Sequence, residues 1–518
     1  MPSIILDIFI ALVVCFIAIF IQRKVTGRSL CSSSLPPGPK KRFLLGNLLE
    51  NPRSLEWETY KKWGEDLESD IIHLDLAGHD VVILNSTQAA EDLLERRSNI
   101  YSSRPRLVMA NEILGWDFNF ALMPYGETWR KCRRMFHQEF HPVASRRFRQ
   151  KEIGATHELL LNLLEEPDIW MAHLRHMAGK IILSIAYGID VQPGNDPYIA
   201  LAEEAIHCLV QAAIPGAFVV DSLPFLKYLP AWAPGASFKR AAETWRRGVH
   251  AFKERPYDAA KKDYLAGIDT ASFVSYRLRS IEGKEQEADW ENIIKFAAGS
   301  MYAAGSDTTV SLLGTFLLAM LENPDVQLKA QHELDGVLGN GRLPDFDDQD
   351  SLPYVTAIIK ESMRWKNVTP IGVAHLVIAD DAYRGYHIPK DSTIIANLWS
   401  MLHDEEMYPN PSEFNPDRFL KNGKLNPAVR DPATIAFGFG RRICPGRYMA
   451  EDSVWIAIAT LLSVFDIRKA VDAQGRTIQP SHDYRSALVY MPPPFKCSIK
   501  PRSERAEALI RSTASLDI

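Results

Sequence analysis

The sequence predicts a mainly α-helical protein with small β-sheets, preceded by a single N-terminal transmembrane helix. Apolar residues recur with helical periodicity through most of the chain, and strand patterns are few and short. An uncharged apolar run at residues 8–21 supports the transmembrane helix. With 518 residues, of which 46% are apolar and 24% charged, and no low-complexity tract, the chain has the composition of one large globular body.

The N-terminal anchor is predicted from length and flanking charge. Residues Ile4–Ile21 contain one charged side chain, Asp7, and as a helix they would span about 27 Å, close to the roughly 30 Å of a bilayer core. Arg23, Lys24 and Arg28 follow the run and no basic residue precedes it, so the positive-inside rule places the body in the cytoplasm. A cleaved signal peptide is the alternative, but its basic residues would precede the apolar run.

The rest of the chain is divided by composition. We expect a transmembrane anchor at 1–22, a basic and Pro-rich linker at 23–41, a body at 42–500 and a polar, loose tail at 501–518. The linker ends in Pro36-Pro37-Gly38-Pro39, which favours a stiff, extended exit from the membrane.

Charge and cysteine content exclude several classes of protein. A net charge of -5 removes the general electrostatic reason to expect nucleic-acid binding. The six cysteines are scattered and form no C-x-x-C pair, which argues against a zinc module or a disulfide scaffold. A reactive cysteine in this chain would therefore act alone and not as part of a C-x-x-C pair.

Periodicity gives the order of elements in the body. Short strands are expected at Ile71–Leu76, Val81–Leu84, His375–Ile378, Ser392–Ala396 and Ser486–Tyr490. Helices are expected at Leu55–Trp63, Thr87–Arg96, Glu127–Phe136, Gly154–Leu164, Met171–Tyr187, Ala200–Ala213, Phe238–Phe252, Trp290–Leu321, Val326–Leu338, Tyr354–Trp365 and Tyr448–Phe465.

One loop combines glycines, arginines and a cysteine immediately before a long apolar helix. Residues 437–446 read FGFGRRICPG. Glycines such as Gly438 and Gly446 let the backbone approach a flat ligand, and a cysteine at a helix start has its thiolate stabilised by free N–H groups. Cys444 is therefore a candidate metal ligand, and Arg442 is a cation suited to a carboxylate. A glycine-rich turn around an inert buried cysteine is the alternative.

This F-x-x-G-x-x-x-C-x-G pattern resembles the haem-binding loop of the cytochrome P450 family. The resemblance implies that Cys444 is the axial thiolate ligand of the iron of haem b. It also implies that Phe437 lies beneath the sulfur and that Arg442 pairs with a haem propionate. Thiolate ligation pushes electron density onto iron and favours cleavage of the O–O bond. The fold class implied is a cytochrome P450 fold behind a membrane anchor.

A polar segment inside the longest predicted helix is similar to the family's oxygen-activation motif. Ala304-Gly305-Ser306-Asp307-Thr308-Thr309 interrupts an apolar helix, and the mid-helix glycine and hydroxyls predict a local distortion. The resemblance implies that Asp307 and Thr308 relay protons to the oxygen being reduced. A polar stripe on a solvated helix is the alternative, but the apolar residues on both sides disfavour it.

Two further segments resemble the family's structural triad. Glu361 and Arg364 stand at i and i+3, on one helical face. The segment at 414–419, FNPDRF, contains Arg418, with Asp417 where the family more often has Glu. Glu361, Arg364 and Arg418 are therefore expected to interlock in a structural role.

Further haem contacts come from Trp129 and Arg133, which match the family's W-x-x-x-R helix, and from His375, where a surface histidine is the alternative. Arg130, Lys131 and Arg134 add a basic patch that could face an acidic electron donor, or form an ordinary solvated helix face.

The resemblance implies a fungal microsomal haem-thiolate monooxygenase of the reductase-dependent class. Such an enzyme would be a single-pass endoplasmic reticulum protein with a cytoplasmic catalytic domain. It would use O₂ and electrons from NADPH-cytochrome P450 reductase, because the chain has no flavin or dinucleotide fingerprint of its own. Its substrate would be a lipophilic small molecule, guessed to be a terpenoid or polyketide of secondary metabolism, and residues Ile206–Pro234 would form a lid that touches the membrane. An isomerase or dehydratase of the same fold, and a non-enzymatic haem-binding protein, are the alternatives.

Overall fold

The computed structural model describes residues 34–43, 45–213, 217–233, 236–268, 270–339, 341–484 and 488–515. The predicted anchor at 1–22 lies outside the described residues, as does most of the linker. Contacts within the chain divide it into two compact units. The smaller unit includes Ala374–Asn397 together with the chain up to Ser103, and the larger comprises Arg104–Val373 and Leu398–Ile518.

The smaller unit is built on a four-stranded sheet of order β1-β2-β6-β3. β1 and β2 are antiparallel, β2 and β6 are parallel, and β3 pairs antiparallel with β6. β1 and β2 are joined by a turn at Gly78. Both strands are largely buried, which explains why their apolar residues could be recognised in the sequence. The elements are α2 (Glu56–Asp66), β1 (Ile71–Leu76), β2 (His79–Leu84), α3 (Thr87–Ala90), a π-helix at Glu91–Arg96, α4 (Ser98–Tyr101), β3 (His375–Leu376), β4 (Asp381–Tyr383), β5 (Tyr386–Ile388) and β6 (Thr393–Ala396).

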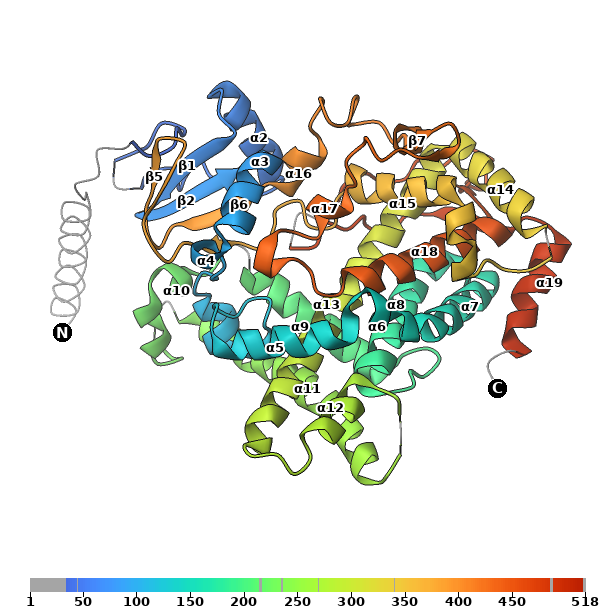
Figure 1. The fold of residues 1–518 in the computed structure, drawn as a ribbon, viewed down its shortest axis with the longest axis horizontal. Helices are drawn as coiled ribbons and strands as arrows, with labels where there is room; N and C mark the ends of the chain where they lie inside the picture. The colour runs from blue at the N-terminus through green and yellow to red at the C-terminus, as the bar shows by residue number, and fades with distance from the viewer. Residues whose placement is uncertain are drawn as a thin grey trace. The chain divides into compact units, whose positions relative to one another are not determined.

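The larger unit is mainly helical, with two-stranded sheets formed by β7 with β8 and by β9 with β10 (Figure 1). Its helices are α5 (Glu127–Phe140), α6 (Pro142–Ser145), α7 (Arg149–Glu165), α8 (Trp170–Tyr187), α9 (Pro197–Ala213), α10 (Val219–Ser222), α11 (Ser237–Leu265), α12 (Phe273–Ile281), α13 (Glu287–Glu322), α14 (Pro324–Leu338), α15 (Pro353–Trp365), α16 (Leu398–Leu402), α17 (Ala433–Ala436), α18 (Arg447–Val464) and α19 (Glu504–Ser512). Its strands are β7 (Leu420–Lys421), β8 (Lys424–Leu425), β9 (Phe465–Lys469) and β10 (Cys497–Pro501). Shorter helical turns lie at Val108–Ile113, Trp116–Phe118, Arg146–Phe148, Pro167–Ile169, Pro224–Tyr228, Phe346–Ser351, Pro416–Phe419, Gly440–Arg442 and Thr513–Ser515.

Helix α13 is the centre of the larger unit. It contacts α5, α8, α11, α12, α15 and α18, and all of its residues from Val310 to Leu321 are buried. Among the described residues it is also the one helix long and apolar enough to cross a membrane, but 72% of that apolar window is covered by protein. The apolar character of α13 therefore reflects its place in the core.

The structure corrects several sequence expectations. The segment Glu504–Ser512 is not loose, because it forms α19 and buries Ala506 and Ile510. Helix α11 continues past Phe252 although Pro256 lies inside it. The strand expected at 486–490 has its first two residues outside the described part, and 488–490 is irregular. Strands β9 and β10 were not expected from the sequence.

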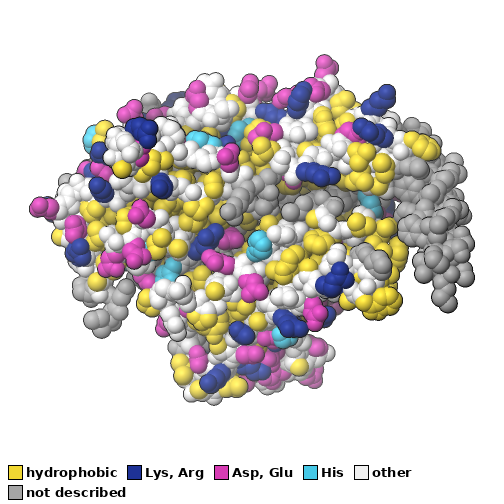
Figure 2. All heavy atoms as spheres, turned by 180° about the vertical axis from the view of Figure 1, so that it is seen from behind, with side chains coloured by type: hydrophobic (Ala, Val, Ile, Leu, Met, Phe, Trp, Pro, Cys, Tyr) yellow, Lys and Arg dark blue, Asp and Glu magenta, His cyan; other side chains and the backbone are white. Residues whose placement is uncertain are grey.

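Surface charges on the described part are mixed. Figure 2 shows one face, on which Lys and Arg side chains are interspersed with Asp and Glu among apolar side chains. Local basic sites must therefore be identified from individual contacts.

Candidate active site

The cysteine loop, residues 437–446, connects α17 to α18. The amide of Cys444 donates to the carbonyl oxygen of Phe437 over 2.8 Å, which closes the loop. Gly438 and Gly440 have φ angles of +76° and +56°, the left-handed region that residues with a Cβ rarely adopt. A Cβ at Gly438 would meet nothing within 4 Å, so the backbone there faces open space. The loop thus presents bare backbone beside Cys444, three residues before α18 begins.

The surroundings of Cys444 bear on whether its thiol ionises. Burial raises the pKa of the thiol, while the amide of Gly446 and the charges of Arg133 and Arg447 lower it. Cys444 still retains intermediate accessible surface, so it borders open space. No group of three or more His, Cys, Asp or Glu in the described residues is arranged to hold a metal.

Arg442 and Trp129 form a cation–π pair beside the loop. The Arg442 guanidinium carbon lies 4.4 Å from the centroid of the Trp129 ring. Its two terminal nitrogens donate to the carbonyl oxygens of Phe120 and Met123, at 3.2 and 2.8 Å. Burial lowers the pKa of Arg442 to about 9, with a further contribution from the nearby charge of Arg133.

Arg104 and Arg133 add two more cations, of which Arg104 is buried and Arg133 is half-buried. Arg133 lies one helical turn after Trp129 on α5 and donates to the carbonyl oxygen of Ile443 over 2.6 Å. Arg104 is 6% exposed and donates to the carbonyl oxygens of Ala121 and Val373. Burial lowers the pKa of both guanidiniums, and the charge of Arg442 lowers that of Arg104 further.

These residues fit an iron porphyrin. Guanidiniums that are buried close to one another carry an unfavourable concentration of positive charge unless anions share the site. The two propionates of a haem would supply that negative charge, and bidentate carboxylate binding suits arginine. The sulfur of Cys444 would supply a protein ligand to the iron, and the open space at Gly438 leaves room for a flat ring.

The polar segment of α13 remains α-helical. The hydroxyl of Thr308 donates to the carbonyl oxygen of Ala304 over 2.8 Å, and that of Ser306 to Tyr302 over 2.7 Å. The expected distortion is therefore limited to hydroxyls that bond carbonyls one turn back. Ala304 is exposed although it lies in the middle of the core helix, so this face borders open space.

Gly305 was expected to distort the helix, but in the structure it allows another helix to pack closely. A Cβ at this position would lie 2.9 Å from Cγ1 of Ile182 on α8. Glycine therefore permits α8 to pack closely on α13, and α8 and α13 are in extensive contact. Asp307, two residues later, is half-buried, and burial raises the pKa of its carboxyl group.

The structure brings Glu361, Arg364 and Arg418 together. Nε and Nη2 of Arg364 donate to the two carboxylate oxygens of Glu361 at 2.7 and 2.9 Å, and both side chains are fully buried. Nε of Arg418 reaches the same carboxylate at 3.1 Å. The amide of Asn415 also donates to Glu361, at 2.7 Å. Asp417 points elsewhere, to a surface pair with Lys329.

His375 belongs to the smaller unit, where it opens β3. It is 7% exposed, so the alternative of a surface histidine is wrong. Its Nδ1 lies 2.7 Å from the carbonyl oxygen of Tyr101. Its contact with a propionate stays a prediction.

Sequence reasoning missed Arg104, Arg447, Arg175 and Glu203. Arg104 lies outside any helix or strand, in Ser-Ser-Arg-Pro-Arg, where no periodicity marks it. Arg447 lies three residues after Cys444, and its proximity to the sulfur could have drawn attention to it. Arg175 and Glu203 read as ordinary polar positions on two amphipathic helices, and only the fold brings them near Asp307.

Comparison with known proteins places these features in one family. The family model for cytochrome P450 matches residues 36–499. A cytochrome P450 monooxygenase of Rhodocybe pseudopiperita is 48% identical over 92% of this chain and 91% of its own length. Another, of Postia placenta, is 45% identical over 94% of each chain. The tryptamine 4-monooxygenase of Psilocybe cyanescens is 43% identical over 92% of this chain and 95% of its own length.

Proposed function

The chain belongs to the cytochrome P450 family and is a monooxygenase, and we propose that it hydroxylates a lipophilic small molecule with electrons delivered from NADPH by a separate reductase. One atom of O₂ would enter the substrate and the other would leave as water, which consumes two electrons and two protons. The observation that carries the proposal is the cysteine loop with its adjoining buried arginines.

We propose that Cys444 holds the iron of haem b and that Arg104, Arg133 and Arg442 hold its propionates. The haem, when bound, supplies the activation of O₂. The cation–π contact of Arg442 with Trp129 and its hydrogen bonds to two carbonyl oxygens hold the guanidinium in place, so its position is already set. The Gly446 amide and the cations Arg133 and Arg447 stabilise the thiolate form of the ligand.

Asp307 and Thr308 are the proposed proton donors. Burial raises the pKa of the Asp307 carboxyl group, so it holds its proton to a higher pH than a solvated carboxyl group and can act as a proton donor. The hydroxyl of Thr308 lies on the α13 face that borders open space, where it can pass a proton by rotating away from the Ala304 carbonyl. The backbone remains helical while this hydroxyl exchanges partners.

The reductase would dock on a basic groove between α5, α12 and the start of α13. This groove has about 200 Å³ of space and is lined by the four cations Lys131, Arg134, Arg277 and Lys284. Lys131 pairs with Glu127 at 3.0 Å and lies 5.3 Å from the centroid of the Trp290 ring. An acidic protein surface fits this charge, as NADPH-cytochrome P450 reductase would provide.

We also propose a single-pass anchor in the endoplasmic reticulum membrane, with the body on the cytoplasmic side. The apolar run at 8–21 and the basic residues after it support this orientation. In the larger unit, Val219, Phe225, Tyr228 and Trp232 are 57–82% exposed within the predicted lid. Exposed apolar side chains of this kind favour contact with lipid. Deleting residues 1–22 should release most of the protein from membranes, and unchanged retention would point to the lid as the principal anchor.

The predicted lid and the relatives indicate which substrate classes to test. A terpenoid or polyketide intermediate of fungal secondary metabolism fits a membrane-facing lid, and the name of one relative adds an aromatic amine, tryptamine, as a competing class. A substrate screen should therefore include all three classes, with binding detected by the shift of the haem absorption band.

The test of the proposed function is reconstitution of the full chain with NADPH-cytochrome P450 reductase under ¹⁸O₂. The expected result is NADPH-dependent product containing one ¹⁸O atom. Product formed without NADPH and without label would indicate an isomerase or dehydratase. A haem protein that gives no product with any of the three substrate classes would support the non-enzymatic alternative.

A further inference from the structure

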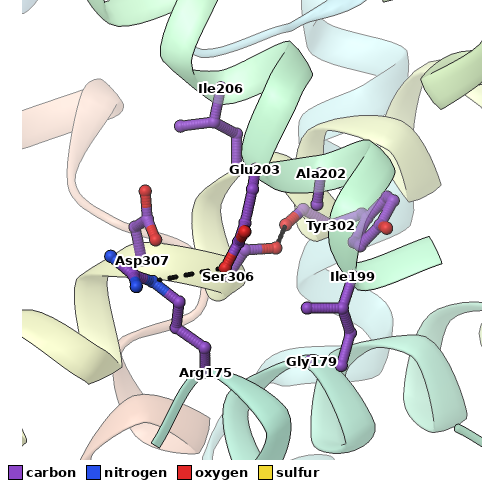
Figure 3. Close-up of a pocket in the computed structure, with 9 residues that line it drawn as sticks. All are labelled: Arg175, Gly179, Ile199, Ala202, Glu203, Ile206, Tyr302, Ser306 and Asp307. Atoms are coloured by element: carbon purple, nitrogen blue, oxygen red, sulfur yellow. Dashed lines mark hydrogen bonds and ion pairs between the residues drawn. The ribbon is translucent and has the colours of Figure 1, made fainter. Parts of the chain in front are cut away.

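A small pocket with a mixed lining of apolar and charged side chains lies on the side of Asp307, where α8, α9 and α13 meet. It is lined by Arg175 and Gly179 from α8, Ile199, Ala202, Glu203 and Ile206 from α9, and Tyr302, Ser306 and Asp307 from α13 (Figure 3). Its free space is about 10 Å³, close to the roughly 10–15 Å³ that one water centre requires.

The arrangement of charges in this pocket is asymmetric. Nε of Arg175 lies 3.5 Å from Oε1 of Glu203, and Figure 3 shows the Arg175 side chain extending from α8 toward the Glu203 and Asp307 carboxylates. The side chain of Glu203 is 53% exposed, whereas Asp307 is half-buried. The guanidinium of Arg175 therefore pairs with the outer carboxylate of Glu203 and acts on the inner carboxyl group of Asp307 through its charge.

Hydrogen bonding leaves a place for water among these groups. Nε of Arg175 is buried and makes no hydrogen bond in the described part of the chain. The Ser306 hydroxyl donates to Tyr302 and keeps its acceptor sites. A water in the pocket could accept from Arg175 and contact Ser306 and Asp307, which gives the two to four polar partners that a buried water needs.

We propose that Glu203 and Arg175 form the proton entry to Asp307: Glu203 exchanges protons with solvent, a pocket water passes them inward, and Arg175 sets the charge of the inner carboxyl group. This inference rests on the proposed function, in which Asp307 supplies protons. Each proton that Asp307 gives up is replaced from solvent through Glu203, so the pocket is unchanged after each transfer. Arg175 and Glu203 are positioning residues because they act through Asp307.

The electrostatics predict opposite effects of the two residues. The positive charge of Arg175 lowers the pKa of Asp307, and the negative charge of Glu203 raises it. The groups that face Asp307 are Arg175 from α8, Glu203 from α9 and Tyr302 and Ser306 from its own helix. A donor must be protonated, so proton delivery falls as the pH rises through the pKa of Asp307.

The test compares Glu203→Gln and Arg175→Gln in the full chain. Product formed per NADPH is measured against pH, and the carboxyl infrared band of Asp307, identified by its loss in Asp307→Asn, is titrated in parallel without turnover. Each measurement gives a pH midpoint. Glu203→Gln should lower both pH midpoints by about 1 pH unit, and Arg175→Gln should raise both by a similar amount. Glu204→Gln is the matched control, because Glu204 is also exposed on α9 but does not line the pocket, and it should leave both midpoints unchanged.

Midpoints that stay at the wild-type value in both variants, or that move in the same direction, overturn the proposal. Arg175→Lys keeps the charge, so it should retain a midpoint near that of wild type even if Arg175→Gln folds poorly. The proposed function is judged separately, by NADPH-dependent product in the wild-type protein. A wild type that makes product, with midpoints that do not respond to either variant, overturns this inference alone.

Discussion

The cysteine loop and the Asp307 pocket serve the same proposed reaction but are assembled differently. In the loop, Phe437, Gly438, Arg442 and Cys444 are neighbours in the sequence, and a short backbone path brings them together. In the pocket, Arg175 and Glu203 come from the consecutive helices α8 and α9, and Asp307 comes from the distant helix α13. Continuous sites can be recognised from the sequence, whereas sites built by helix packing require the fold.

The Glu361 triad combines both kinds of assembly and gives the largest expected effect. Glu361→Gln would leave the buried guanidinium of Arg364 without its carboxylate, and Arg418 would lose the same partner. Breaking a buried pair in this way destabilises a protein by about 3–5 kcal/mol. The midpoint of urea unfolding should fall accordingly. A change below about 1 kcal/mol would show that the triad does not hold the larger unit together.

Replacing Arg442 tests how far haem binding at the cysteine loop depends on contacts with distant parts of the chain. Arg442→Gln removes a buried cation that also contacts carbonyls near α5, so haem should dissociate about 10- to 100-fold faster, as expected for loss of charge-assisted hydrogen bonds of about 1.5–3 kcal/mol. Arg441→Gln is the matched control, because Arg441 is exposed and contacts Tyr125. Transfer of haem to apomyoglobin measures the rate. Equal rates of haem loss in the two variants would show that Arg442 does not hold the haem.

Much of this fold was predictable from the sequence, for a physical reason. β1, α8, α13 and α15 bury regular apolar patterns, and their observed bounds lie close to those expected. Strands β9 and β10 were missed although their buried and more exposed residues alternate, because each has only five residues and β9 follows α18 directly. The continuation of α11 through Pro256 was missed because proline normally ends a helix and tertiary packing overrides that tendency.

The same distinction applies to the site. Cys444, Arg442 and the Glu361–Arg364 spacing were identified from local motifs. Arg104 could not be, since nothing in its loop distinguishes it from the neighbouring Arg106, which is exposed and pairs with Glu112. Burial of a guanidinium is a property of the fold, so the sequence alone cannot distinguish these two arginines.

A substitution of Thr308 tests whether protons pass along the face of α13 that borders open space. Thr308→Ala removes the hydroxyl proposed to pass protons, so NADPH use should continue while product per NADPH falls about tenfold or more. Thr309→Ala is the control, because successive residues on a helix point about 100° apart. Product and NADPH consumption measured together give the coupling. Equal coupling in the two variants would exclude Thr308 from the proton path.

The smallest effect is expected at the surface. Asp417 pairs with Lys329, and both side chains are about half exposed. Asp417→Asn should change the free energy of unfolding by less than about 1 kcal/mol, in contrast to Glu361→Gln in α15. A larger loss in urea unfolding would mean that Asp417 contributes to the buried triad after all.

The central claim is that the sulfur of Cys444 binds the haem iron. The most direct measurement is the carbon monoxide difference spectrum of the reduced wild-type protein, with Cys444→Ala and Cys208→Ala as its comparison and control. Cys208 is buried on α9 outside the loop, and burial raises the pKa of its thiol to about 11. Wild type and Cys208→Ala should both give the long-wavelength band of thiolate-ligated haem, and Cys444→Ala should lack it. The same band in Cys444→Ala, or no band in the haem-loaded wild type, would contradict the account.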